Sequence, residues 1–245
     1  MILLLITVFI VCLCFRFPIA FSLGLSCLVY FFFKGTPLEV VPLKMYAGID
    51  VFVLLSIPGF IIAGNLMNQG GLTDKIINFC NHLLGHVRGG LSYVNISASM
   101  LFAGISGTAI SDTASLGAVM IPAMKKEGYD SDFSCAVTAA SSTVGPIIPP
   151  SLPMIIAATL SGLSVGKLFL AGAIPGLLLG FGLILVAYFV AKKKNYPKHP
   201  KSSILQIIKS FTDTFWALLM TLIILFGIIG GVFTPTEASV IAVLY

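Results

Sequence analysis

Two short stretches of small, hydroxyl-bearing residues interrupt long apolar segments of this 245-residue chain. The first is GISGTAISDTAS, from Gly104 to Ser115, and the second is SSTVGPIIPPS, from Ser141 to Ser151. Glycine and proline break a helix in both. A break at membrane depth leaves backbone N–H and C=O groups without partners, and it persists only where protein, water or a solute supplies them. We therefore predict that both stretches form one polar site within a membrane protein.

Both stretches supply the groups that a small anion or a sodium ion needs. Half-helix N-termini present N–H groups to carboxylates, while unwound carbonyls and hydroxyls coordinate Na⁺. Gly104, Gly107 and Gly145 let the backbone approach a ligand closely. The hydroxyl groups on offer are those of Ser106, Thr108, Ser111, Thr113, Ser115, Ser141, Ser142, Thr143 and Ser151.

Asp112 is the one acidic residue deep in this region, and two interpretations of it stay open. Intramembrane acids are commonly functional, so Asp112 is a cation ligand, a proton site or a gate. Alternatively it caps the helix that follows, by accepting hydrogen bonds from the N–H groups of residues 113–115. Polar helix packing is the alternative for both stretches together. Two stretches, each with a glycine or proline break, favour a solute site.

The composition excludes a soluble globular domain. The chain is 58% hydrophobic and 9% charged, with a mean hydropathy of +1.06, whereas soluble domains are about 25% charged. Apolar runs near the length of a membrane span recur, without the alternating pattern of barrel strands. The sequence therefore predicts an all-α, multi-pass integral membrane protein.

The net charge of +5 comes mainly from residues 192–201, which hold five lysines. The positive-inside rule predicts a cytoplasmic loop there, and a nucleic-acid or lipid-headgroup role is not needed to explain it. The five cysteines show no metal or redox spacing. His82 and His86 form an i, i+4 pair without a nearby third ligand, which favours an interfacial polar face over a metal site.

Three elements must position the two stretches. Half-length helices from Leu91 to Ala103 and from Leu116 to Met124 predict a re-entrant hairpin around the first stretch. The Pro149-Pro150 pair predicts a discontinuous helix around the second, because proline cannot continue a helix interior. Residues 69–90 place apolar side chains at helical spacing among polar ones, which predicts an amphipathic helix along the membrane surface.

Four segments together resemble the large membrane subunit of tripartite ATP-independent periplasmic (TRAP) transporters. They are Gly48 to Met67, Gly85 to Gly107, Gly145 to Ser151 (GPIIPPS) and Gly231 to Ala238 (GVFTPTEA). The resemblance covers nearly the whole chain, which is similar to the N-terminal half to two-thirds of that subunit. None of the four segments is specific alone.

The resemblance implies an elevator-type, sodium-coupled transporter with inverted repeats, like other members of the ion transporter superfamily. A transport domain would carry a small organic acid, such as a sialic acid or a C4-dicarboxylate, across the bacterial inner membrane past a fixed scaffold. A periplasmic binding protein would deliver the substrate, and a small four-helix membrane subunit would complete the scaffold. No nucleic acid, enzymatic activity or catalytic residue is implied.

The resemblance also implies a division of the chain into five parts. They are scaffold-type spanning helices (1–68), an interfacial arm helix (69–90), the hairpin and discontinuous helix of the first repeat (91–163), a spanning helix with the basic loop (164–203) and the start of a second repeat (204–245). A second hairpin, a second sodium site and half of the substrate cavity would then lie past Tyr245, so this piece alone is not expected to transport.

By the same resemblance, the two stretches divide the ligands between backbone and side chains. The Na⁺ ligands implied, mainly backbone oxygens, are Ser106, Gly145, Ile148 and Pro150. The substrate contacts implied are Ser106, Thr108, Ser111 and Ser151. Asp112 remains a gate or a helix cap.

Two other functions fit parts of the sequence. Gly104-Ile105-Ser106-Gly107 matches a pattern of intramembrane serine proteases, which would need a histidine base near Ser106. The three histidines of the chain all lie outside the predicted spans. A solute channel is the other alternative, and it would pass solute without a sodium gradient.

Overall fold

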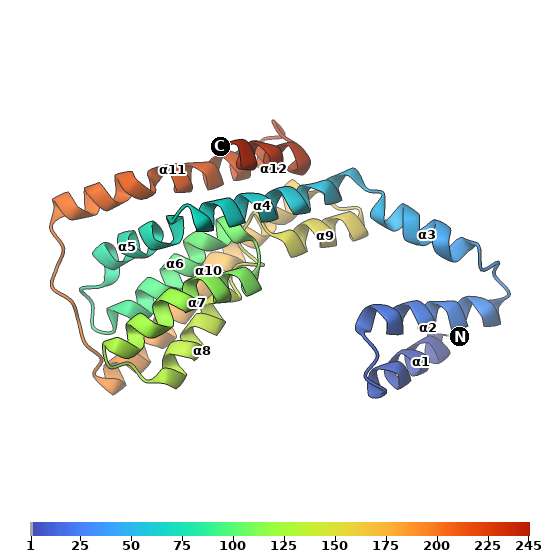
Figure 1. The fold of residues 1–245 in the computed structure, drawn as a ribbon, viewed down its shortest axis with the longest axis horizontal. Helices are drawn as coiled ribbons and strands as arrows, with labels where there is room; N and C mark the ends of the chain where they lie inside the picture. The colour runs from blue at the N-terminus through green and yellow to red at the C-terminus, as the bar shows by residue number, and fades with distance from the viewer. Residues whose placement is uncertain (1) are drawn as a thin grey trace. The chain divides into compact units, whose positions relative to one another are not determined.

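The computed structural model describes residues 2–245 and divides the chain into two compact units, one ending at Val51 and one covering Phe52–Tyr245. All regular structure in this described range is helical (Figure 1), which confirms the predicted all-α class. Three helical segments are long and apolar enough to cross a membrane: Phe52–Gln69, Val165–Lys194 and Ile204–Ile229.

The first unit contains three helices, α1 (Ile2–Cys14), α2 (Ile19–Lys34) and α3 (Val40–Ile49). α1 and α2 pack against each other. The helix over residues 56–69 contacts helices of the second unit. The predicted end of the scaffold-type helices at residue 68 remains a prediction.

The second unit begins with a short 3₁₀ turn, η1 (Phe52–Leu55). Its α-helices are α4 (Ser56–Gln69), α5 (Leu72–Leu84), α6 (Gly90–Ser106), α7 (Ala109–Lys126), α8 (Ser131–Ser142), α9 (Leu152–Ser161), α10 (Val165–Lys194), α11 (Ile204–Ile229) and α12 (Pro235–Leu244). α6, α7 and α8 lie side by side, and α5 packs on both α6 and α11 (Figure 1).

α6 and α7 form a helical hairpin whose arms are longer than predicted, because the polar stretch breaks only at Gly107-Thr108. The hydroxyl residues beyond the break are compatible with a helix because they bond within it. Thr113 Oγ1, for example, donates to Ala109 O at 2.8 Å. The chain is broken around Pro149-Pro150, as predicted: α8 ends at Ser142 and α9 begins at Leu152.

Buried polar contacts join the hairpin to α8. Asn95 Nδ2 donates to Thr138 Oγ1 at 2.7 Å, and the hydroxyls of Ser99 and Ser141 lie 2.9 Å apart. All four side chains are fully buried. Because buried polar groups without partners are costly, these contacts hold α6 and α8 in one register.

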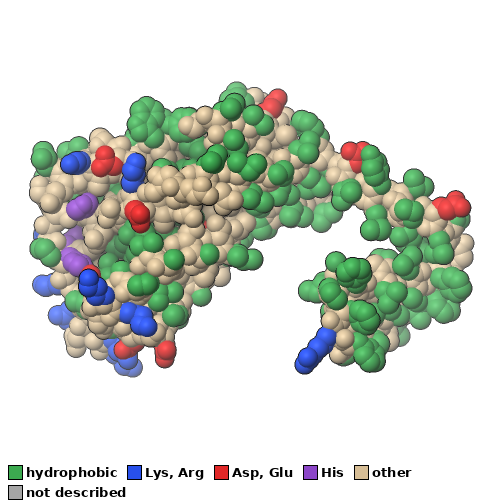
Figure 2. Space-filling view, viewed as in Figure 1, with side chains coloured by type: hydrophobic (Ala, Val, Ile, Leu, Met, Phe, Trp, Pro, Cys, Tyr) green, Lys and Arg blue, Asp and Glu red, His purple; other side chains and the backbone are tan. Residues whose placement is uncertain are grey.

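One end of the second unit is rich in charge (Figure 2). There, beyond α7 and α10, Lys194 Nζ lies 2.8 Å from Asp130 Oδ2, and the Tyr196 hydroxyl donates to the same oxygen at 3.0 Å. The hydrogen bond from Lys194, followed by that from Tyr196, holds the pKa of the Asp130 carboxyl below its usual value. The cluster ties the α7–α8 turn to the end of α10.

Replacing Thr138 with valine keeps the volume but removes the oxygen partner of the Asn95 amide, which then keeps only Met124 Sδ at 3.7 Å. We expect Thr138→Val to destabilise the protein by about 1 kcal/mol, measured by thermal unfolding in detergent. Thr143→Val is the matched control, because Thr143 is exposed and donates only to Ala140 O of its own helix. Equal loss in both variants would contradict a stabilising role for the α6–α8 contact.

The Asp130 cluster predicts a pH dependence. A carboxyl with a lowered folded-state pKa stabilises the protein fully above its unfolded value, about 4, and loses this contribution as pH falls through the lowered value. Asp130→Asn should therefore melt below the wild type at pH 7 and together with it at strongly acidic pH. Asp213→Asn, an exposed acid outside the cluster, should show no such convergence, and a constant offset for Asp130→Asn would refute the assignment.

Candidate functional site

The tip of the hairpin is a two-residue turn. Ser106 ends α6, and Gly107 adopts a left-handed conformation with φ = 60° while its N–H donates to Ala103 O at 3.0 Å. Thr108 is extended, and its hydroxyl accepts from the Ser111 N–H at 3.3 Å. Glycine adopts the left-handed conformation readily, and threonine is a favoured N-cap residue, so the local sequence defines this turn.

The tip of the hairpin lies against the break between α8 and α9. The Leu152 N–H donates to Gly107 O at 3.3 Å. A Cβ added at Gly107 would lie 2.7 Å from Pro150 O, so only glycine permits this approach. The structure thus brings the two broken stretches into direct backbone contact.

Asp112 lies fully buried beneath this contact. Its Oδ1 accepts a hydrogen bond from Ser106 Oγ. Its Oδ2 is buried and has no hydrogen-bond partner among residues 2–245. A Cβ added at Gly145 would lie 2.5 Å from that oxygen, so the carboxylate links the hairpin to the α8–α9 break.

The helix-cap interpretation of Asp112 is wrong, because Thr108 occupies the N-cap position of α7. A capping residue needs a non-helical backbone, and Thr108 has φ = −140° and ψ = 137°. Asp112 lies inside the helix, with its own N–H bonded to Thr108 O at 3.2 Å. Its carboxylate is thereby left for Ser106 and for whatever satisfies Oδ2.

Two predicted ligands have other contacts. Ser151 caps α9: its hydroxyl accepts from the Met154 N–H at 3.3 Å and donates to Pro146 O at 2.6 Å. The side chain of Ile148 points at α10, where Cγ1 would lie 2.6 Å from a Cβ at Gly176. Substrate binding by Ser151 and Na⁺ binding through the Ile148 carbonyl remain predictions.

Sequence reasoning missed contacts that other helices make with the hairpin. On α4, Asn68 Nδ2 donates to Ser115 Oγ at 3.0 Å, and a Cβ at Gly64 would lie 3.5 Å from Ile105 O. On α11, the methyl group of Thr221 fills the space where a side chain at Gly104 would lie. For the Asn68–Ser115 contact, the only signal in the sequence was the polar Asn68 near the end of α4.

The donors gathered here are oxygens: backbone carbonyls, hydroxyls and one carboxylate. Such oxygens are the ligands that hard cations such as Na⁺ favour, whereas a small organic anion would bind the nearby N–H and hydroxyl groups. Within residues 2–245 no group of three or more His, Cys, Asp or Glu side chains comes together. The unpartnered Asp112 Oδ2 fits a cation, because a buried carboxylate oxygen without a partner is costly.

Gly145→Ala tests the contact with Asp112. The added methyl would force the carboxylate or the loop to move, and we expect a loss of about 1–3 kcal/mol in unfolding free energy. Gly182→Ala is the control, because Gly182 is helical and a Cβ there meets nothing within 4 Å. Equal unfolding temperatures for Gly145→Ala and Gly182→Ala would contradict the close approach of Asp112 Oδ2 to Gly145.

Comparison with known proteins identifies the family. A protein-family model described as "Tripartite ATP-independent periplasmic transporter, DctM component" matches residues 6–245. The chain is 44% identical over 229 residues to the sialic acid TRAP transporter large permease protein SiaM of Vibrio cholerae, covering 93% of this chain and 54% of that protein. It is 40% identical over 225 residues to the C4-dicarboxylate TRAP transporter large permease protein DctM of Pseudomonas aeruginosa, covering 91% and 53%.

A third relative is the sialic acid TRAP transporter permease protein SiaT of Haemophilus influenzae. It is 43% identical over 229 residues, which cover 93% of this chain and 37% of that protein. This chain thus spans about half, or less, of the length of these relatives. They are transport proteins and not enzymes, which removes the serine-protease alternative.

The match to this family supports the predicted localisation, that of a multi-pass protein of the bacterial inner membrane. The long apolar helices of the chain agree with that location. The chain belongs to the DctM component family of tripartite ATP-independent periplasmic transporters.

Proposed function

We propose that this chain provides the first half of the solute-carrying unit of a sodium-coupled importer for a small organic acid. The observation that carries the proposal is the meeting of two helix breaks beside the buried Asp112 Oδ2, which has no hydrogen-bond partner within residues 2–245. Relatives are named for sialic acid and for C4-dicarboxylates, and both are organic acids.

Na⁺ would be held between the hairpin tip and the α8–α9 break. The backbone oxygens assigned to it are those of Ser106, Gly145, Ile148 and Pro150, and Asp112 Oδ2 adds a negative charge. A bound Na⁺ would neutralise that charge. Without the ion, the buried carboxylate would repel an anionic substrate, so ion and substrate binding become coupled.

The substrate would meet the exposed side of the hairpin tip. Thr108 and Ser111 are partly exposed there, whereas Ser106 is 7% exposed and turned towards Asp112. The first N–H groups of α7 and the helix dipole favour a carboxylate at this point. Ser151 would contribute through its backbone, because its hydroxyl is already engaged.

The packing supports the proposal that both halves of the site move as one body. The contacts of Asn95 and Ser99 with α8, together with the Gly107–Leu152 hydrogen bond, fasten both halves of the site to each other. An elevator mechanism needs such a rigid carrier, which slides past a scaffold completed by the small four-helix subunit. A periplasmic binding protein would supply the substrate.

Uptake by the complete permease tests the sodium site. Asp112→Asn keeps the shape of the side chain and removes its charge, so the Na⁺ concentration for half-maximal uptake should rise about tenfold. The assay uses proteoliposomes containing the full large subunit, its small partner and the binding protein, with uptake followed across a series of Na⁺ concentrations.

Ser161→Ala provides the control, since Ser161 is exposed and donates within its own helix. An unchanged sodium dependence in Asp112→Asn would remove Asp112 from the proposed site. Equal wild-type uptake with and without a sodium gradient would favour the channel alternative instead.

A further inference from the structure

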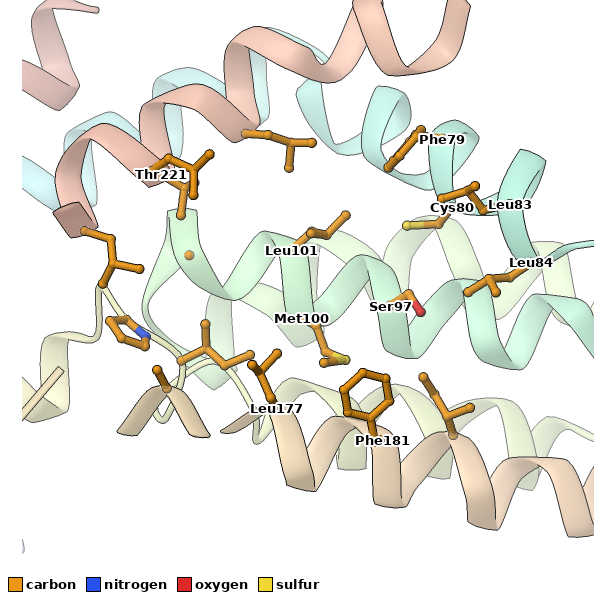
Figure 3. A pocket seen from close by; sticks show the side chains of 18 residues that line it. Phe79, Cys80, Leu83, Leu84, Ser97, Met100, Leu101, Leu177, Phe181 and Thr221 are labelled. Carbon is orange, nitrogen blue, oxygen red and sulfur yellow. The ribbon is translucent and has the colours of Figure 1, made fainter. Parts of the chain in front are cut away.

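An apolar cavity of about 730 Å³ lies within the second unit, between α5, α6, α10 and α11. Its volume is within the range of small-molecule sites, about 300–1,000 Å³. Leu177 and Phe181 of α10 face the same space as Phe79 and Leu83 of α5, with Met100 of α6 between them (Figure 3). We propose that this cavity binds one acyl chain of an anionic glycerophospholipid.

The lining favours an apolar occupant, because nearly all of it is hydrocarbon. Its two hydroxyls are those of Ser97 and Thr221, and the Thr221 hydroxyl donates to Ala217 O of its own helix. Along α10 the lining runs from Ala173 to Ile184, about 16 Å at 1.5 Å per residue. That length is about half of the 30 Å hydrocarbon core of a bilayer, the depth that one leaflet's acyl chain fills.

The anionic headgroup follows from the charge at one end of the cavity. Leu84 and Ile184 line that end, and Lys192 follows Ile184 by eight residues on α10, about 12 Å. Lys192 and Lys193 are exposed, and neither has an ion-pair partner among residues 2–245. Figure 2 shows basic side chains gathered at this end of the unit.

The chain itself holds the basic residues over this end. The segment after α10 is bonded to the segment after α5: His199 N–H donates to Gly85 O at 3.1 Å, and Gly89 N–H donates to Pro197 O at 2.9 Å. Arg88 donates to Asn195 Oδ1 at 2.9 Å. Lysines beside the membrane attract anionic lipids, so the basic loop and the cavity together match the two ends of one lipid.

The other end of the cavity borders the candidate site. Gly104, Ile148 and Pro149 belong to the two broken stretches and also line the cavity. An acyl chain there would support the backbone that carries the proposed Na⁺ ligands. The lipid would thus act as a structural ligand of the site without touching the transported solute.

The test uses the complete permease, equilibrated in mixed micelles with equal parts of phosphatidylglycerol and phosphatidylcholine. Native mass spectrometry then counts each bound lipid per protein. We expect wild type to retain phosphatidylglycerol in preference to phosphatidylcholine. Absence of retained lipid would overturn the proposal and mean that the remaining polypeptide covers the cavity, and equal retention of both lipids would overturn the headgroup assignment.

Ala173→Phe would place a ring in the cavity and should lower retained phosphatidylglycerol about tenfold, equivalent to displacing roughly two methylene groups. Ala171→Phe is the matched control, because Ala171 is exposed on α10 and outside the lining. Full retention by folded Ala173→Phe would overturn the proposal.

A second variant remains informative if Ala173→Phe fails to fold. Lys192→Gln/Lys193→Gln should lower the preference for phosphatidylglycerol about fivefold for each charge removed. Lys34→Gln/Lys44→Gln removes equal charge from exposed positions of the first unit and should leave it unchanged. The same loss in both pairs would show a non-specific charge effect and would overturn the lipid site.

Discussion

The direct backbone contact between two helix breaks is the constraint on which the rest of this structure depends. Gly107 O accepts from the Leu152 N–H at 3.3 Å, and Gly107 has no side chain to hold Pro150 away. Each break alone would leave backbone groups unsatisfied in an apolar surrounding. Together they satisfy part of that demand, and the buried Asp112 carboxylate lies beside them against Gly145.

The surrounding helices contact the hairpin that carries this tip from several sides. α4 contacts it through Asn68, α11 through Thr221 and α8 through Thr138 and Ser141. All these contacts use small or hydroxyl-bearing residues. Such residues allow close helix approach in a membrane, where burying apolar surface gives no driving force between helices. The polar character of the unit's interior is therefore part of its packing as well as of its proposed chemistry.

Much of this arrangement could be predicted from the sequence because helix breaks have strong local signals. Pro149-Pro150 marked the break between α8 and α9, and Gly107 marked the tip of the hairpin. The extent of the hairpin arms was less predictable, since hydroxyl residues beyond the break lie within α7, where Thr113 Oγ1 donates to Ala109 O. Thr108 and Asp112 are both acceptable N-cap residues by type. Which of them caps α7 depends on which one adopts the extended backbone, and Thr108 does so. Asp112 is therefore free to pair with Ser106.

The roles of Ser151 and Ile148 were harder still to predict, because they depend on the path of the chain through the α8–α9 break. The Ser151 hydroxyl donates to Pro146 O, five residues earlier, whereas Ile148 lies against α10, which is distant in sequence. The cavity between α5, α6, α10 and α11 likewise had no local signal, because it arises between helices that are separately unremarkable apolar segments. Local chemistry thus indicated the site, whereas its wall and its neighbours required the tertiary structure.

We propose that both breaks bind one cation together. Hydrogen–deuterium exchange of the complete permease, compared in Na⁺ and in K⁺, measures this directly at the amides of residues 104–115 and 141–152. We expect Na⁺ to slow exchange in both segments together, with the same concentration dependence. Protection of one segment alone, or of neither, would contradict a shared site.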